Sequence, residues 1–284
     1  MCALLNSQPM GFYSPSALVQ DAQRHGIEVR ATDITVSGWD SALEPSAQAQ
    51  PAWCAWACRC CAACGQRRRR GSRMRAIRPF ESVSDLARRA QLDRHDLQVL
   101  VGANALAALA GHRRQALWQA VGAVPDKDLL RPTSPVEEIP QLAAPSEGEN
   151  IVGDYRAQGL TLGRHPLALL RALLANRFLP SVHPQRLPGW PAGARGLSIV
   201  TVRQRPGTAK GVLFMTLEDE TGNVNVIVWP SLVEQQRKEV LGAALLGVYG
   251  VWQRQGEVRH LVAKRLVDMS ALLGRLDTTS RNFC

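Results

Sequence analysis

GLSIVTVRQ at residues 196–204 opens a series of short segments in which apolar and polar residues alternate. A period of two is typical of half-buried strands. Four further segments predict strands: GVLFMTLED at 211–219, NVNVIVWP at 223–230, ALLGVYGVWQRQ at 244–255 and EVRHLVAKRLVD at 257–268. PSLVEQQRKEVLG at 230–242 predicts a helix between the third and fourth strands. This order is that of a five-stranded barrel of the OB type, whose open face commonly binds single-stranded nucleic acid.

The length and composition of the chain set broad limits. Its 284 residues suffice for about two domains. No apolar run approaches the roughly 20 residues of a membrane-spanning helix. The N-terminal sequence MCALLNSQPMGFYS lacks the basic start and apolar centre of a secretory signal. We therefore expect a soluble, cytoplasmic protein that does not engage a membrane.

The net charge of +10 is unevenly distributed. Eight arginines and no acidic residue lie between Trp53 and Arg78, so one segment supplies most of the excess. From Arg195 to Arg265 there are ten Lys or Arg and six Asp or Glu, a net charge of +4. The smaller excess on the predicted barrel is the one that indicates a nucleic-acid partner.

The basic segment also holds five of the seven cysteines: Cys54, Cys58, Cys60, Cys61 and Cys64. Two overlapping Cys-x2-Cys pairs have the spacing of zinc ligands. The pairs share Cys61, however, and no folded insert separates them as it does in a closed tetrahedral site. Nothing in the sequence indicates an oxidising compartment in which disulfides would form. We interpret residues 45–78 as an unstructured tract without a metal.

Residues 1–44 and 79–121 form two regions with secondary-structure signals of their own. In the first, Ser14-Pro15 predicts the start of a helix and IEVRATDI predicts a strand. In the second, Ser82-x2-Asp85 and Asp93-x2-Asp96 predict capped short helices. Seven apolar residues of this region are expected to share a core: Leu97, Leu100, Val101, Leu106, Leu109, Leu117 and Trp118.

The remaining regions connect these parts. The proline-rich, acidic composition of residues 122–150 predicts a linker that cannot bury a core. Residues 151–194 resume a helical pattern, the barrel is expected at 195–270, and residues 271–284 form a tail. The predicted fold class is α+β.

Several stretches of the chain together resemble a known family. They are ALLNSQPMGFYSPSALVQDAQRHGIEVR, RPFESVSDLARRA, ALAALAGHRRQALW, DYRAQGLTLGRHPLALLR and TVRQRPGTAKGVLFMTLEDETGNVNVIVWP. They resemble the C-terminal portion of bacterial error-prone DNA polymerases, C-family enzymes similar to the alpha subunit of polymerase III. The resemblance implies that residues 1–44 are the tail of a fingers domain and that residues 79–121 are a helix-hairpin-helix remnant. It places the barrel near the template strand.

The resemblance also implies catalytic parts that this sequence lacks. Family members are several times longer, and the carboxylates that hold magnesium for phosphoryl transfer lie upstream of the residues present here. The one acidic triplet of the barrel, Glu218-Asp219-Glu220, leads into a turn and is interpreted as a solvated hairpin. We expect no catalytic or metal-binding residue, no cofactor in this chain, and no DNA synthesis by the chain alone. Magnesium is expected in the intact family.

The tract departs from the family at a place where a Val-Arg-Leu-Gly-Leu-like strand is usual. GC-rich codons for that strand, read from the second base, give Cys-Ala-Trp-Ala-Cys, which is the sequence from Cys54 to Cys58. Our hypothesis is that residues 53–75 are read out of frame and that the frame is restored before Ile77. The coding DNA tests this hypothesis.

Single-strand binding requires cations along the backbone path and flat rings on which bases stack. The cations and rings predicted to bind nucleic acid are Arg203, Arg205, Lys210, Phe214, Trp229, Trp252, Arg254, Arg259 and Lys264, with Tyr249 and Arg265 as further candidates. For Phe214 and Trp229 a second interpretation stays open, because an aromatic side chain that faces inward from a strand is a core residue. His165 before Pro166 is interpreted as a turn residue.

Three functions stay open at this point. The first is a truncated error-prone DNA polymerase, with translesion synthesis and damage-induced mutagenesis beside other SOS proteins implied for the intact family member. The second is a stand-alone module that binds single-stranded nucleic acid. The third is a non-functional pseudogene product. In the first two, the expected partner is single-stranded or template DNA.

Overall fold

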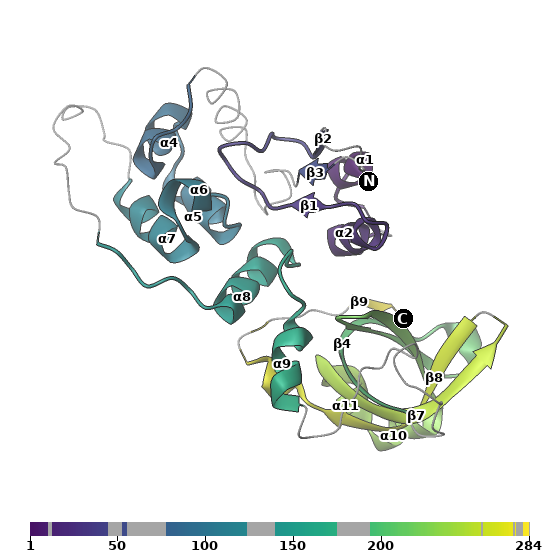
Figure 1. Ribbon diagram of the computed structural model, residues 1–284. Coiled ribbons are helices and arrows are strands. Elements are labelled where there is room, and N and C mark those ends of the chain that lie inside the picture. Colours follow the sequence, from purple (N-terminus) through teal and green to yellow (C-terminus); the bar gives the residue numbers. More distant parts are fainter. Residues whose placement is uncertain are drawn as a thin grey trace. The chain divides into compact units, whose positions relative to one another are not determined.

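The computed structural model divides the chain into two compact units, Met1–Leu162 and Gly163–Cys284 (Figure 1). The structure describes residues 1–10, 13–44, 53–55, 78–123, 140–174, 194–256, 258–274, 276 and 281–283. Within these residues, every helix is too short or too polar to cross a bilayer. The boundary between the units falls inside the helical region predicted at 151–194.

The first unit begins with a small α/β portion. Its elements are α1 (Cys2–Asn6), α2 (Pro15–Arg24), β1 (Val29–Arg30), β2 (Ala42–Glu44) and β3 (Trp53–Ala55). The Ser14 side chain accepts a hydrogen bond from the Ala17 amide, so α2 begins where the sequence predicts. β3 pairs in parallel with β1 and antiparallel with β2, so part of the tract expected to be unstructured is a strand. Residues 45–52 and 56–77, including the other tract cysteines, lie outside the described residues.

Four short helices follow: α4 (Val83–Ala90), α5 (Arg94–Gly102), α6 (Ala107–Ala110) and α7 (Arg113–Gly122). Both predicted caps are confirmed. Ser82 accepts from the Asp85 amide, and Asp93 and Asp96 form a reciprocal capping box. Because every helix here has at most ten residues, tertiary packing stabilises them more than their own propensity does.

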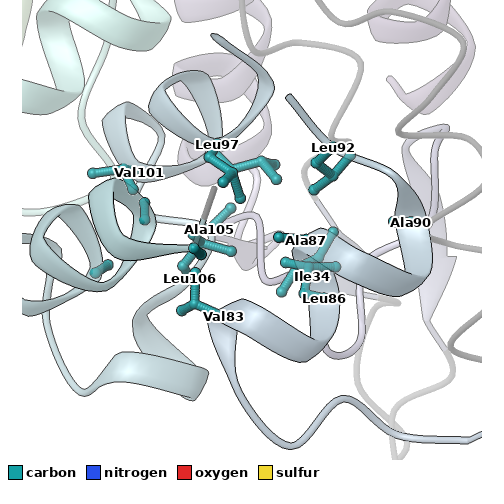
Figure 2. Packing of buried hydrophobic residues seen from close by; sticks show 14 of the residues in the cluster. Ile34, Val83, Leu86, Ala87, Ala90, Leu92, Leu97, Val101, Ala105 and Leu106 are labelled. Carbon is teal, nitrogen blue, oxygen red and sulfur yellow. The ribbon is translucent and has the colours of Figure 1, made fainter. Parts of the chain in front are cut away.

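The core of these helices is apolar and nearly closed to solvent (Figure 2). Leu86, Leu100 and Leu106 are fully buried in it. Ile34, from the N-terminal portion, joins the same core, and its amide donates to the Ala105 carbonyl at 2.9 Å. The core therefore ties the N-terminal portion to the helices.

The structure corrects two of the predicted core residues. Leu117 and Trp118 on α7 are 46% and 55% exposed. The buried face of α7 instead consists of Gln115, Ala116 and Ala120. Small residues on this face let α7 lie close to α5, which leaves the larger side chains outside.

Helix α8 (Glu147–Gln158) returns against α7 through polar contacts. It starts inside the predicted linker because Ser146 and Glu149 form a capping box. Arg113 donates to the Asn150 carbonyl at 2.8 Å and pairs with Asp154. An added Cβ at Gly153 would lie 2.5 Å from the Arg113 guanidinium, so the end of the Arg113 side chain would have to shift to admit it. Residues 124–139 of the predicted linker lie outside the described residues.

The second unit is a barrel preceded by α9 (Pro166–Leu174). Its elements are β4 (Ala194–Gln204), β5 (Leu213–Asp219), β6 (Gly222–Val228), α10 (Pro230–Gln235), α11 (Arg237–Gly242), β7 (Leu245–Gln255), β8 (Val258–Asp268) and β9 (Arg281–Phe283), with the 3-10 turns η4 (Gly207–Ala209) and η5 (Ser270–Leu273). All five predicted strands are present. The prediction of an α+β fold with a five-stranded OB-type barrel is confirmed.

The barrel closes because β4 pairs with two strands in succession. Residues 194–199 of β4 pair with β7, and residues 199–204 pair with β5. The register shifts between Val200 and Val202, which is a bulge at Thr201, and the Thr201 hydroxyl donates to the Thr216 carbonyl at 3.1 Å. A bulge bends its strand, so β4 can turn from one partner to the other. Inside, the strands place leucine, valine and methionine in a single apolar cluster.

The predicted helix after the third strand is broken into α10 and α11 at Gln236. Gln236 has φ −121° and ψ 43°, outside the helical range. Its side-chain amide donates to the Leu266 carbonyl and its side-chain oxygen accepts from the Leu266 amide, both at 2.8 Å. At Gln236 the helix is interrupted, and two side-chain hydrogen bonds to β8 hold α10 and α11 against the barrel.

A close approach between the backbones of β7 and β8 also supports closure of the barrel, and it leads to a prediction about stability. An added Cβ at Gly250 on β7 would lie 2.3 Å from the Val262 carbonyl oxygen of β8. Substitution G250A is expected to lower the free energy of unfolding by about 1–3 kcal/mol, because backbone must move to admit the methyl group. Urea unfolding followed by circular dichroism measures this loss. The matched control is G242A, whose added methyl group meets no atom within 4 Å; equal effects of the two substitutions would contradict the prediction.

Candidate nucleic-acid interface

The outer faces of β4, β5 and β6 form one continuous surface. Along β5, buried residues alternate with partly exposed ones, so every second side chain points away from the core. Phe214 is one of the outward residues, so it is not part of the barrel core. Two rows make up the open part of the surface: Gln204, Phe214 and Ile227 in one, and Val202, Thr216 and Asn225 in the other.

The loop between β4 and β5 flanks this surface with two predicted cations. Arg205 and Lys210 are both exposed. Lys210 and Gly211 have φ values of 48° and 84°, so the loop turns sharply through the left-handed region before β5. An added Cβ at Gly211 would lie 3.5 Å from Pro230 and 3.7 Å from the Arg205 guanidinium, so the loop lies beside the start of α10.

Trp229 and Lys264 lie at the same end of the barrel as that loop. Strands β6 and β8 are parallel, with Ile227 in register with Val262. Trp229 and Lys264 each lie two residues beyond these partners, and both are exposed, Trp229 at 52%. The structure therefore brings Arg205, Lys210, Phe214, Trp229 and Lys264 to one end of the barrel.

Arg254 and Arg259 lie elsewhere, near the tip of the β7–β8 hairpin. They occupy register positions directly opposite each other. Two like charges in such positions destabilise a strand pair. The Arg254 Nε donates a hydrogen bond to the Gly256 carbonyl at 2.8 Å. A neutral carbonyl does not neutralise the positive charge of the guanidinium.

Two aromatic candidates on β7 differ in their surroundings. Trp252 packs against the apolar cluster inside the barrel and is half-buried. This position makes it a core residue rather than a platform for a base. Tyr249 lies on the opposite face of β7, where the Arg265 guanidinium lies 5.5 Å from the centre of its ring.

Arg203 is the predicted cation whose position the structure corrects. Its side chain turns into the barrel and is 6% exposed. The guanidinium donates to the Val240 carbonyl at 2.7 Å and to the Ala243 carbonyl, at the end of α11. Burial lowers the pKa of this guanidinium by desolvating its charged form. The Arg203 guanidinium therefore binds carbonyls at the C-terminal end of α11, where cations are favoured, and it is not part of the outer surface.

The acidic triplet is a contact site for α9 and not a solvated hairpin. Arg171 on α9 donates to Glu220 at 2.7 and 3.1 Å and lies 3.7 Å from an oxygen of Asp219. Asp219 is 4% exposed and also accepts from the Thr221 amide at 2.7 Å. His165, expected to be a turn residue, caps α9 by accepting from the Leu167 amide, and its Nε2 lies 3.5 Å from Glu218.

These contacts bear on the magnesium expected in the intact family. Such a site needs convergent carboxylates with free oxygens. The carboxylates of the triplet are instead engaged by Arg171, His165 and Thr221. Within the residues that the structure describes, no cluster of three or more His, Cys, Asp or Glu side chains could hold a metal ion. The residues that the structure describes therefore do not fit the metal.

Residues 199–268 match the family model described as an OB-fold nucleic acid binding domain. The match covers the barrel from the middle of β4 to the end of β8. Fold, open surface and family model together define this part of the chain as an OB-fold nucleic-acid-binding domain.

Comparison with curated proteins identifies the relatives of the whole chain as error-prone DNA polymerases. The polymerase of Azoarcus sp. (strain BH72) is 53% identical over 289 residues, which cover 100% of this chain and 27% of that protein. The polymerase of Ralstonia nicotianae is 55% identical over 290 residues, and that of Dechloromonas aromatica 53% over 283 residues, each with 27% of its length covered. The resemblance to this family is thus confirmed, and the chain spans about a quarter of the length of these relatives.

One solved structure shares a weaker likeness. It is the crystal structure of the S. pombe Stn1-ten1 complex, with a TM-score of 0.24, 13% identity, and coverage of 31% of this chain and 69% of that chain. This likeness is too low to bear on function.

The buried position of Arg203 predicts that its removal destabilises the barrel. R203M is expected to lower the free energy of unfolding by about 1–3 kcal/mol, because the carbonyls at the end of α11 lose their donors inside the protein. The control R205M removes an exposed guanidinium from the neighbouring loop and is expected to change stability by less than about 0.5 kcal/mol. Urea unfolding of both variants decides; a stable R203M protein would contradict the assigned role.

Proposed function

We propose that the barrel binds single-stranded DNA across the outer face of β4, β5 and β6. The observation that carries this proposal is the arrangement of three cations and two rings around one end of that face: Arg205, Lys210, Lys264, Phe214 and Trp229. Cations follow a phosphate backbone, and each ring can hold a base by stacking, worth about 1–3 kcal/mol per base.

The acidic residue at the other end of the face indicates the path that the DNA strand follows across it. Glu218 lies outward on β5, in register with Asn223, and the start of α9 covers it, so its side chain is 14% exposed. A phosphate is repelled by this carboxylate and attracted by Arg205 and Lys210. The open path therefore runs from the loop between β4 and β5 across the two rows of the face.

For the whole protein we propose the role that the relatives' name gives them, an error-prone DNA polymerase. In this role the present chain contributes a DNA-binding portion, and nucleotidyl transfer with magnesium belongs to parts outside it. Translesion synthesis, a place beside other SOS mutagenesis proteins and a cytoplasmic location are parts of the same proposal. The whole-chain identity to proteins of this name supports it.

Salt dependence tests the binding proposal. A labelled oligothymidylate is titrated with the full chain at several salt concentrations, and fluorescence anisotropy gives the affinity. R205M is expected to weaken binding and to reduce the log–log salt slope by about 0.7, because one phosphate contact on a single strand is lost. The control is R237M, which removes an exposed arginine from α11, outside the face.

Two results would contradict this proposal. One is the absence of binding by the wild-type chain at low salt. The other is an equal effect of R205M and R237M, because a diffuse positive charge on the barrel would then explain the affinity.

A further inference from the structure

The first of the two open rows of the outer face continues beyond β6 onto β8 and β7. β6 pairs in parallel with β8, with Ile227 in register with Val262, and Val262 is in register with Val251 on β7. Residues in register on neighbouring strands lie on the same face of a sheet. The row that begins with Gln204, Phe214 and Ile227 is therefore extended by Val262 and Val251.

The second row is extended in the same way. Val226 on β6 is in register with Leu261 on β8, so the residues that precede them, Asn225 and His260, lie side by side. Val226 and Leu261 both belong to the apolar cluster inside the barrel, so alternation turns their predecessors outward. His260 is in turn in register with Gln253 on β7. The second row thus consists of Val202, Thr216, Asn225, His260 and Gln253.

The two extended rows differ in their chemistry. Beyond Gln204 the first row is apolar, and it ends at Val251, which is 37% exposed. From β5 onward the second row consists of side chains that form hydrogen bonds, and it contains no lysine, arginine or carboxylate. Flat apolar surface supports the faces of bases, whereas uncharged polar side chains suit their edges.

The order of the outward residues along β8 matches the parts of a nucleotide. Lys264, Val262 and His260 are spaced by two residues, so they follow one another on the outer face, and Lys264 is exposed. A cation, an apolar surface and a hydrogen-bonding group therefore succeed one another across this strand. This is the order of a phosphate, the face of a base and the edge of that base.

The second row holds hydrogen-bonding capacity that contacts among the described residues do not use. The Thr216 hydroxyl donates to Oδ1 of Asn225 at 3.3 Å, which leaves the two hydrogens of the Asn225 amide nitrogen for another acceptor. Nδ1 of His260 is buried and has no hydrogen-bond partner in the described part of the chain, which is uncommon for a polar atom in a native protein. Asn225 and Gln253 are both exposed.

We propose that the DNA strand continues from β6 onto β8 and β7, and that Asn225, His260 and Gln253 bind the edges of its bases. This inference rests on the proposed binding of single-stranded DNA and adds to it a means of distinguishing bases. Contacts to phosphate carry no sequence information, whereas hydrogen bonds to base edges do. The barrel is therefore a single-strand binder with a base preference, and this preference depends on the second row.

A comparison of two probes tests the contacts to bases. One is labelled oligothymidylate, and the other is an oligonucleotide of equal length made of abasic sites, which keeps the phosphates and lacks the bases. N225L and Q253M in the full chain are expected to weaken binding of oligothymidylate by about threefold or more, as loss of a hydrogen bond does, with the salt slope unchanged. Both are expected to bind the abasic probe as the wild type does.

A second measurement tests the base preference itself. The affinities of the wild-type chain for oligothymidylate, oligocytidylate and oligoadenylate are expected to differ by about threefold or more. N225L and Q253M are expected to bring these affinities closer together, because stacking alone tolerates every base. The matched controls are N223L, one row further along β6, and Q235M on α10; both residues are exposed, and neither variant is expected to change the preference.

The outcomes separate this inference from the proposed function. If Q253M and H260F bind oligothymidylate as the wild type does, the strand does not reach β8 and β7 and the inference fails. Equal wild-type affinities for the three oligonucleotides, or equal losses on the abasic probe, would also overturn it. The proposed function survives each of these results if R205M still weakens binding. If the wild-type chain binds none of the probes at low salt, both fail.

Discussion

The second unit depends on the ability of one strand to serve two partners. β4 pairs with β7 along its first half and with β5 along its second, and the bulge at Thr201 turns it from one to the other. The same bulge sets what faces outward. Strict alternation from the buried Val200 would place Arg203 outside, but the extra residue reverses the order, so Arg203 enters the barrel and Val202 and Gln204 face out. Closure, the anchoring of α11 and the composition of the outer face therefore share one cause.

In each unit, polar contacts at the ends of helices and strands hold one further helix in place. In the second unit, Arg171 and His165 hold α9 against the acidic turn, which closes one end of the outer face and leaves the cationic end open. In the first unit, Arg113 and its neighbours bind the returning α8 segment, and Gln115 exchanges hydrogen bonds with Pro140 and Leu142. Both sets of contacts join residues far apart in the sequence, and both use arginine against carboxylates.

The sequence predicted the five strands because alternation is a local property, and it predicted the starts of α2, α4 and α5 because caps are local too, although it missed the capped start of α8. It failed where a single residue changes the order of faces or where distant contacts decide. We predicted Arg203 on the outer surface because nothing in the residue pattern of β4 indicates the bulge at Thr201. Trp252 was offered as a stacking residue, although its even spacing from the buried Val248 indicates the barrel interior. The pairing of Glu220 with Arg171 spans 49 residues, which no local pattern reveals.

Amide chemical-shift mapping with an oligothymidylate tests the central claim most directly, because it locates the ligand without any substitution. The account predicts that the largest shifts fall on the outward residues of β4, β5 and β6, with Gln204, Phe214 and Asn225 among them, and on the loop that carries Lys210. Inward residues such as Met215 are expected to shift little. Shifts concentrated on α10 and α11, with the outer face unchanged, would contradict it.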